Sequence, residues 1–317
     1  MGNYTRPVEF VLIGFSTMRA LQNVLLAPCL VLYLLMIAGN ATIVAMICLD
    51  SRLHTPMYFF LCNFSLVEML VTSTVVPRML TDLVAEKNTI SFGGCLVQFY
   101  FYFSLGTTAF LLLAAMSIDR YVAICHPLRY STILSNSICI QLVFGSWALS
   151  FFSMIPPTIF RAMLPFCNSN QIDHFFCDNA PLLQLSCSGT RLIELWDFLL
   201  AVLFILSSFL VTIVSYTAII STILRIPSAS GRQKAFSTCA SHFIVVVIGY
   251  GTTIFIYVRP SKNYSTDMNK MVALLTSVLT PFLNPYIFTL RNEKVKEVFR
   301  DWMEHLRGAQ RTEPRLG

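Results

Sequence analysis

The sequence predicts an all-α membrane protein, a bundle of seven transmembrane helices followed by an amphipathic C-terminal helix. Only 12% of its 317 residues are charged and 56% are hydrophobic, against roughly 25% charged and 45–50% apolar in soluble domains. Six segments carry no charge at all: residues 20–49, 88–118, 130–160, 198–224, 235–258 and 271–290. A seventh apolar segment is interrupted by Glu68 and Arg78.

Each of these segments is long enough to cross the hydrocarbon layer, which takes about 20 residues. The strands of a barrel would alternate over shorter lengths. We therefore expect one domain over 1–317, with an outer tail at 1–23 and an inner tail at 291–317. The helices are expected at about 24–49, 57–80, 92–123, 138–160, 195–224, 235–258 and 269–290.

The positive charges predict the orientation of the bundle in the membrane. With the N-terminus outside, the inner segments hold 13 of the 22 Lys and Arg residues and 7 of the 16 Asp and Glu residues. The whole formal net charge of +6 then lies on the inner side, as the positive-inside rule requires. The basic excess thus indicates membrane orientation and not nucleic-acid binding.

The outer tail carries a glycosylation acceptor, Asn3-Tyr4-Thr5, which agrees with this orientation. A second match at Asn263 lies in a short outer loop close to the membrane, and its glycosylation stays open. Residues 1–20 have no apolar core followed by a small-residue cleavage site. We therefore expect the first helix to act as its own insertion signal.

The inner tail predicts one further helix, over 292–306. Val295, Val298, Phe299 and Trp302 recur there at helical spacing, and charged residues fill the other face. This pattern is typical of a helix lying along the inner membrane surface. A solvated tail helix is the alternative.

Asp119 and Arg120 stand together at the inner end of the third helix, after 31 residues without charge. The carboxylate can restrain the guanidinium, which keeps its charge throughout. Release of Arg120 could then open an inner cavity. Ordinary anchoring of the helix at the water boundary is the alternative for this pair alone.

The surrounding residues resemble the olfactory receptors, a branch of the rhodopsin-like (class A) G-protein-coupled receptors. The resemblance covers nearly the whole chain. It lies in MSIDRYVAICHPLRY at 116–130, LHTPMYFFLCNFSLVEML at 53–70, KAFSTCASH at 234–242 and PFLNPYIFTLRN at 281–292. One departure is Gly249-Tyr250-Gly251, where the family usually has Phe before the Tyr. The short outer loop before helix 7 favours the tetrapod-type class II.

The resemblance implies the activity and the residues that carry it. We expect a plasma-membrane receptor that binds an odorant and activates a heterotrimeric G protein of the stimulatory olfactory type, raising cAMP. Arg120 would swing toward Tyr216, and the inner end of helix 6 would move outward. The residues expected to take part are Asp119, Arg120, Tyr121, Tyr216, Lys234, His242, Asn284, Pro285 and Tyr286.

Four of the ten cysteines lie on the oxidising outer side: Cys95, Cys167, Cys177 and Cys187. Four cysteines allow three pairings. The resemblance favours Cys95–Cys177 with Cys167–Cys187, and Cys95–Cys187 stays open. The other six cysteines are read as reduced packing residues. A metal site at His174–Asp178 is not expected, because an oxidised Cys177 offers no thiolate.

Glu68 is an acid in the middle of helix 2, where a charge is costly and usually faces the interior. The resemblance implies a sodium and water pocket formed by Asn40, Glu68 and Asn284. A polar packing bridge without an ion is the alternative. No other cofactor is expected.

The ligand pocket is expected inside the outer third of the bundle. Helix 3 presents an aromatic stripe in which Gly106 opens space and Thr107 offers a hydroxyl; such a stripe can also be plain core. Apolar walls with few hydroxyls suit a small, uncharged ligand, and helix 3 has no acid before Asp119 to bind an amine. The expected lining is Phe99, Tyr102, Phe103, Gly106, Thr107, Phe110, Phe204, Ser207, Tyr250, Thr253, Tyr257 and Ser277.

The sequence also bears on two other function classes, enzymes and transporters. The arrangements HExxH and GxSxG and a Walker loop are absent, so the sequence does not indicate an enzyme. A transporter would show internal repeats and paired broken helices. The chain shows no internal repeat, and seven spans do not divide into two halves.

Overall fold

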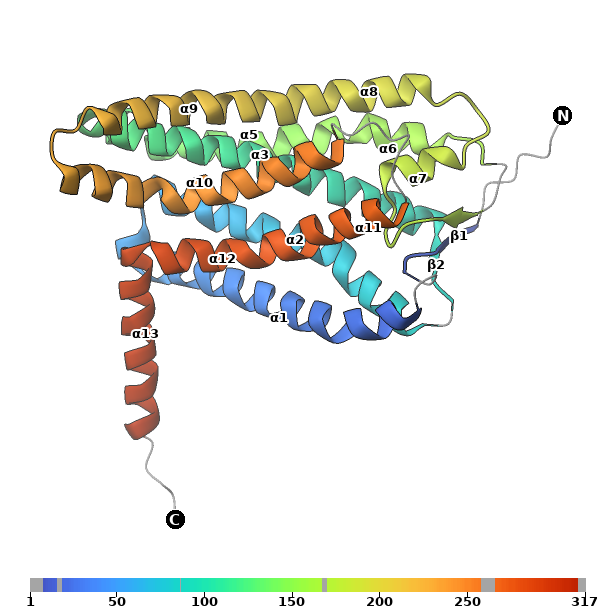
Figure 1. Cartoon of the computed structure of the whole chain (residues 1–317), viewed down its shortest axis with the longest axis horizontal. Helices are drawn as coiled ribbons and strands as arrows, with labels where there is room; N and C mark the ends of the chain where they lie inside the picture. The colour runs from blue at the N-terminus through green and yellow to red at the C-terminus, as the bar shows by residue number, and fades with distance from the viewer. Residues whose placement is uncertain (1–7, 16–18, 86, 167–169, 258–265, 313–317) are drawn as a thin grey trace, which may run out of the picture.

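The computed structural model describes residues 8–15, 19–85, 87–166, 170–257 and 266–312 of the chain. Figure 1 shows long helices running side by side as one bundle, with the small strands β1 and β2 at one end and the last helix, α13, projecting from the other. The fold class predicted from the sequence is confirmed, with one addition, a three-stranded sheet at the outer end.

Seven helical segments of the described chain make up the bundle. They are α1 (Arg19–Leu49), α2 (Pro56–Val84), α3 (Phe92–Cys125), α5 with α6 (Asn136–Ser153, Ile155–Ala162), α8 with η3 and α9 (Arg191–Ala201, Val202–Leu206, Ser207–Leu224), α10 (Ala229–Tyr257), and α11 with η4 and α12 (Thr266–Leu274, Leu275–Leu279, Thr280–Arg291). Within the described residues, six are long and apolar enough to span a membrane, and α10 has an apolar stretch at His242–Thr253.

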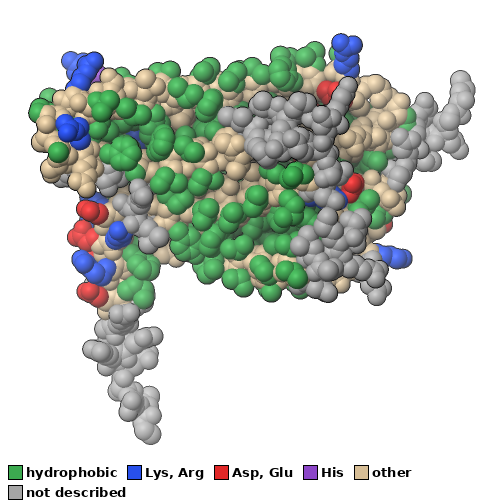
Figure 2. Space-filling model, viewed as in Figure 1, with side chains coloured by type: hydrophobic (Ala, Val, Ile, Leu, Met, Phe, Trp, Pro, Cys, Tyr) green, Lys and Arg blue, Asp and Glu red, His purple; other side chains and the backbone are tan. Residues whose placement is uncertain are grey.

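The observed helices run beyond several of the charge-free segments. α3 continues past Asp119 and Arg120 to Cys125. α2 likewise continues past Arg78, whose guanidinium bonds Asp82 one turn later at 2.9 Å. Charged side chains near a helix end can reach the polar boundary while the backbone stays helical. The charge-free runs therefore mark the lipid-facing core of each helix and not its ends. Figure 2 shows this core as a broad hydrophobic band between the charged ends.

The outer end is closed by a small sheet and a folded loop. β1 (Glu9–Leu12) pairs antiparallel with β2 (Thr89–Ser91) and parallel with β3 (Gln171–Ile172). The loop also holds the short helix α7 (Asn179–Gln184). The sequence predicts residues 9–12 as part of the outer tail. They alternate between exposed and buried, and Phe10 is fully buried.

The inner end carries the short elements η1 (Ser51–Leu53), η2 (Pro127–Arg129), α4 (Tyr130–Ile133) and the helix α13 (Glu293–Thr312). On α13, Val295 and Val298 are buried against the bundle, whereas Phe299 is 40% exposed. Arg52 of η1 donates to Asp301 of α13 at 2.8 Å, which fixes the angle at which the helix leaves the bundle. Figure 1 shows it projecting sideways from the inner end.

Candidate ligand cavity and activation site

An internal cavity of about 180 Å³ lies between α2, α3, η3, α10 and the η4–α12 segment. Its walls are mainly apolar and carry several hydroxyl groups. The lining residues are Phe64, Glu68, Val71, Tyr102, Phe103, Gly106, Thr107, Ala109, Phe110, Leu113, Ile205, Val245, Gly249, Thr252, Thr253, Thr276, Ser277, Thr280, Pro281 and Asn284.

Seven of the twelve residues expected from the sequence line this cavity: Tyr102, Phe103, Gly106, Thr107, Phe110, Thr253 and Ser277. Gly106 leaves the room predicted for it, because a Cβ built there would meet no atom within 4 Å. The hydroxyls of Tyr102 and Ser277 are hydrogen-bonded at 3.2 Å, which ties α3 to η4 across the outer side of the cavity.

Four expected residues lie elsewhere. Phe99 is buried beneath the guanidinium of Arg161, which sits 4.3 Å from its ring centroid. Phe204 is buried outside the lining, and Ser207 is exposed on the outer face of its helix. Tyr250 packs between two phenylalanine rings behind the cavity wall, each 5.1 Å away. The side chain of Tyr257 lies outside the described residues.

Two π-helical segments, η3 and η4, explain part of this difference. Each widens one turn of a membrane helix, and each contributes to the lining, Ile205 from η3 and both Thr276 and Ser277 from η4. A π-turn takes one extra residue and so shifts the faces that follow it. Ser207 comes directly after η3 and is exposed, so it lies outside the lining.

The sequence reading did not expect α2 to line the ligand cavity. Phe64, Glu68 and Val71 form its wall on that side, so an acid does reach the site, from helix 2 instead of helix 3. The sequence does indicate Glu68 as an interior acid, but as a member of a separate ion pocket. In the structure, Glu68 and Asn284 line the same cavity as the residues expected to bind the ligand.

Glu68 and Asn284 form a buried pair at this cavity. The Asn284 Nδ2 donates to Glu68 Oε1 at 2.9 Å, and the two residues are 5% and 2% exposed. Glu68 Oε2 and Asn284 Oδ1 have no hydrogen-bond partner among the described residues. Such free oxygens are the donor type that hard cations and water favour. Asn40, the third expected member, instead donates to the Met36 carbonyl one turn back in its own helix, at 3.1 Å.

At the inner end, Asp119 holds two partners. The Arg120 Nε donates to Asp119 Oδ2 at 2.8 Å, and the Tyr130 hydroxyl donates to Asp119 Oδ1 at 2.5 Å. Asp119 is fully buried and Arg120 is 7% exposed. Burial and the Asp119 carboxylate raise the pKa of Tyr130, so its hydroxyl stays protonated and can donate.

Of the other expected activation residues, Tyr216 and His242 lie near this pair. Tyr216 shares a 2.6 Å hydrogen bond with His242 Nδ1, which joins α9 to α10, and Tyr121 bonds His126 at 3.1 Å. A Cβ at Gly39 would lie 3.1 Å from Pro285, so α1 and α12 approach closely there. The side chain of Lys234 lies outside the described residues, and Tyr286 donates to the Leu35 carbonyl at 3.5 Å.

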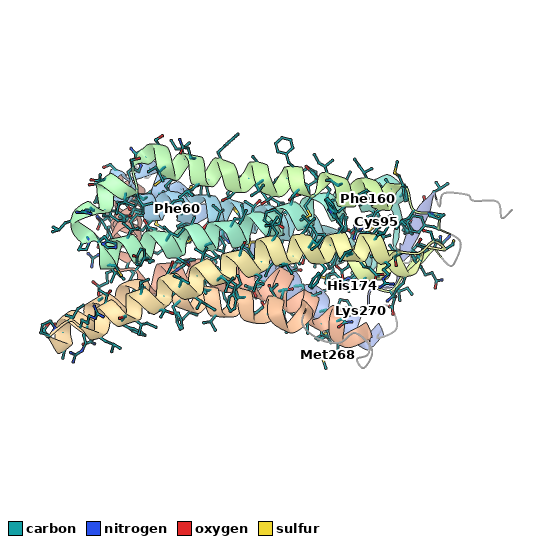
Figure 3. All side chains as sticks on the ribbon, turned by 90° about the horizontal axis from the view of Figure 1, so that it is seen from above. Phe60, Cys95, Phe160, His174, Met268 and Lys270 are labelled. Carbon is teal, nitrogen blue, oxygen red and sulfur yellow. A yellow bond between two sulfur atoms is a disulfide. The ribbon has the colours of Figure 1, made fainter. Side chains whose placement is uncertain are left out.

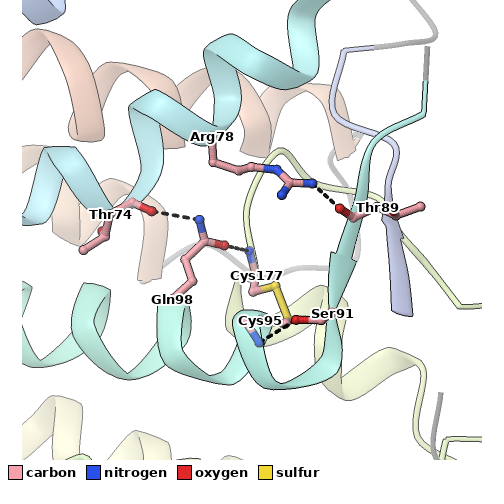
Figure 4. The surroundings of a disulfide bond; sticks show 8 residues. Thr74, Arg78, Thr89, Ser91, Cys95, Gln98 and Cys177 are labelled. Carbon is pink, nitrogen blue, oxygen red and sulfur yellow. Dashed lines mark hydrogen bonds between the residues drawn. A yellow bond between two sulfur atoms is a disulfide. The ribbon is translucent and has the colours of Figure 1, made fainter. Parts of the chain in front are cut away.

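The outer disulfide Cys95–Cys177 is confirmed. Gln98 supports it by donating to the Thr74 carbonyl at 2.8 Å and accepting from the Cys177 N–H at 3.0 Å, as Figure 4 shows. Cys187 is also disulfide-bonded, which rules out the alternative Cys95–Cys187. Cys167, like Asn3 and Asn263, lies outside the described residues. The six remaining cysteines are free.

His174 lies beside this disulfide, in the loop between α6 and α8. Its ring stacks on Phe175 at 4.7 Å between centroids, and burial lowers its pKa. Figure 3 shows His174, Lys270 and Cys95 at the same outer end. No group of three or more metal-binding side chains occurs among the described residues.

Comparison with known proteins decides the family. The sequence model of the olfactory receptors matches residues 29–305. Human olfactory receptor 6J1 is 53% identical over 309 residues, which cover 97% of this chain and 89% of that protein. The chain belongs to the olfactory receptor family.

Two further relatives agree over similar lengths. Human olfactory receptor 6S1 is 50% identical over 95% of this chain and 91% of its own. Mouse olfactory receptor 6E1 is 50% identical over 95% of this chain and 96% of its own. The protein is thus a multi-pass receptor of the plasma membrane that serves odorant signalling through a G protein, and it is not an enzyme.

Proposed function

We propose that this olfactory receptor binds a small, mostly apolar, uncharged odorant in the cavity between α2, α3, η3, α10 and η4–α12. The observation that carries the proposal is the open volume beside Gly106, inside the bundle and walled by Phe103, Phe110 and Val245. Its size, about 180 Å³, is below the roughly 300–1,000 Å³ of sites for drug-sized ligands. A volatile-sized molecule fits such a space.

Occupation of the cavity favours the active form by acting on the helices that wall it. A ligand shifts a pre-existing equilibrium only through its different affinity for the two states. Asn284 lines the cavity and lies next to Pro285, where α12 meets α1. We place the response in α10 and α12, so that Tyr216 leaves His242 and Arg120 leaves Asp119 to meet Tyr216.

The partner is proposed to be a G protein of the stimulatory olfactory type, which raises cAMP. Leu128 supports a contact at the inner end, because it is 98% exposed on the short helix η2. Tyr130, two residues later, bonds Asp119. A partner that covers Leu128 would therefore act on the same carboxylate that restrains Arg120. We expect Leu128→Ala to weaken cAMP signalling at unchanged odorant affinity.

The base of the cavity is the proposed place of a sodium ion or ordered water. Glu68 Oε2 and Asn284 Oδ1 would hold it, and the ion would supply a positive charge opposite the Glu68 carboxylate. The Asn40 Nδ2 donates to the Met36 carbonyl, so only the Oδ1 of Asn40 could join this site.

The pocket is tested by filling it. Gly106→Leu should weaken the larger ligands of a series most, measured as cAMP potency at matched surface expression. Gly145→Leu is the matched control, because Gly145 is exposed on α5 and a Cβ there would also meet nothing within 4 Å. If every ligand keeps its potency in the Gly106→Leu variant, the cavity is not the odorant site.

The coupling is tested at Arg120. Arg120→Ala should abolish odorant-driven cAMP while most of the protein still reaches the cell surface, as measured by surface labelling. Normal signalling from a well-expressed variant would contradict the role of this residue. A screen of the wild-type receptor against a broad odorant panel provides the ligands for both experiments.

A further inference from the structure

The hydroxyl groups of the cavity differ in whether their protons are free. Thr252 donates to the Ile248 carbonyl at 2.8 Å, Thr253 to the Gly249 carbonyl at 2.8 Å, and Thr276 to the Ala273 carbonyl at 2.9 Å. Each bond stays within the residue's own helix, a common arrangement for threonine. Since a hydroxyl has one proton and two lone pairs, these three groups offer the cavity acceptors only.

Thr107 is the exception. It lines the cavity beside the open volume at Gly106, and no hydrogen bond of its hydroxyl is found within the described part of the chain. Its neighbour Thr108, which faces the protein, donates to the Ser104 carbonyl at 2.9 Å. The Thr107 hydroxyl can therefore turn and donate to a ligand.

The remaining polar groups add more acceptors than donors. The hydroxyls of Tyr102 and Ser277 share one hydrogen bond, which uses one of their two protons. At the base, Glu68 Oε2 and Asn284 Oδ1 accept from no described residue. Oxygen lone pairs are thus in excess along the walls, and a buried acceptor left without a donor costs free energy. A ligand that brings its own proton relieves this imbalance, whereas one that only accepts does not.

We propose that this receptor selects hydroxyl-bearing odorants, small alcohols or phenols, over carbonyl compounds and ethers of the same carbon skeleton. The proposal rests on the cavity being the odorant site. The ligand hydroxyl accepts a hydrogen bond from Thr107 and donates one to Thr252, Thr253 or Thr276. A ketone or an ether can accept a hydrogen bond from Thr107 or from the remaining proton of the Tyr102–Ser277 pair, but it has no proton to give to the acceptor threonines.

The first test compares an alcohol with the ketone and the methyl ether built on the same chain, for several chain lengths. The readout is cAMP potency in cells that express the wild-type receptor. One hydrogen bond corresponds to about two- to twelve-fold in potency, and we expect the alcohol to lead by that factor. A ketone or ether equal to its alcohol would overturn the selectivity and leave the odorant function standing. If no odorant of a broad panel raises cAMP, both proposals fall.

The second test separates donor from acceptor by single Thr→Val changes, which keep the shape of the side chain. Thr107→Val should weaken alcohol and ketone by similar factors and leave their potency ratio unchanged. At least one of Thr252→Val, Thr253→Val and Thr276→Val should weaken the alcohol alone, which brings the ratio toward one.

The matched control is Thr217→Val. Thr217 is exposed on α9, away from the cavity, and donates to its own helix in the same way, at 2.8 Å to the Ile213 carbonyl. It should change neither potency nor ratio. If all three acceptor variants keep the wild-type ratio, the assignment of the acceptor wall is refuted, whatever the absolute potencies are.

Discussion

The outer and inner ends of the bundle are held together by different means. At the outer end a disulfide, a three-stranded sheet and a buried arginine join segments far apart in the sequence. At the inner end the buried ion pair joins two neighbours in one helix, Asp119 and Arg120. Different segments meet there through hydrogen bonds between side chains, from Tyr130 to Asp119 and between Tyr216 and His242. A disulfide or an ion pair between distant segments resists their separation, whereas single hydrogen bonds can exchange partners. The difference agrees with the proposed function, in which the outer end frames the ligand and the inner end switches.

The strongest expected effect is at Arg161 in α6. It is fully buried, donates to Asp197 of α8 at 2.5 Å, and also bonds Asn179 of the outer loop. Removing one member of a fully buried ion pair strands the other, at a cost of about 3–5 kcal/mol. We expect the lower end here, because the Asp197 side chain is 18% exposed and also accepts from Asn179. Arg161→Met should therefore sharply reduce folding yield and surface expression.

Removal of both charges gives the control for Arg161. The double change Arg161→Met with Asp197→Leu leaves no stranded carboxylate and should recover part of the surface expression, measured by labelling intact cells. A single variant that is delivered like the wild type would show that the outer end does not depend on this contact.

The disulfide comes next. Cys177→Ser should destabilise the receptor by about 2–4 kcal/mol, the usual contribution of such a bridge, and should lower the amount of mature receptor. Cys48→Ser is the comparison, because Cys48 is free and exposed. If the two variants mature equally, the Cys95–Cys177 disulfide does not stabilise the outer end.

At the inner end a smaller change should affect signalling more than folding. Tyr130→Phe removes one hydrogen bond to the Asp119 carboxylate, worth about 1.5–3 kcal/mol for a charged partner. With Asp119 less restrained, Arg120 is released more easily, and cAMP without odorant should rise. Basal cAMP at the wild-type level, with normal surface expression, would mean that Tyr130 does not restrain the switch.

The smallest expected effect is a pH dependence at the outer loop. Burial lowers the pKa of His174 below its usual 6.5, so the folded loop favours the neutral ring. The unfolded loop binds the proton more readily, and stability therefore falls as the pH drops below about 6.5, by up to ~1.4 kcal/mol per pH unit. Asp173, Asp178 and Lys270 are the charged groups near the ring.

Hydrogen exchange of residues 170–178 at pH 7.5 and 5.5 measures this change. Exchange should be faster at the lower pH in the wild type. In His174→Phe, which keeps an aromatic ring and cannot take up a proton, the difference should shrink. The same pH dependence in both proteins would assign the effect to another group.

The sequence was sufficient for the helices and for the pairing of Asp119 with Arg120, because both depend on local patterns. Charge-free runs locate membrane helices, and Asp119 and Arg120 are neighbours whatever the tertiary structure. The ligand cavity was harder. Helical spacing places Phe99 and Tyr102 on one stripe, but it does not show that Arg161, 62 positions after Phe99, covers the first of them. The π-turns η3 and η4 contribute residues to the lining, and no local pattern marks such a turn in advance.

As the proposed odorant site, the volume beside Gly106 also bears on how the receptor responds to temperature. This space, about 180 Å³, has mainly apolar walls. Burying apolar ligand surface in such a space carries a negative change in heat capacity. The enthalpy of binding therefore varies with temperature, and it varies more for odorants that bury more carbon. Two odorants of equal potency at one temperature would then differ in potency at another, so the ranking of ligands depends on temperature as well as on the side chains.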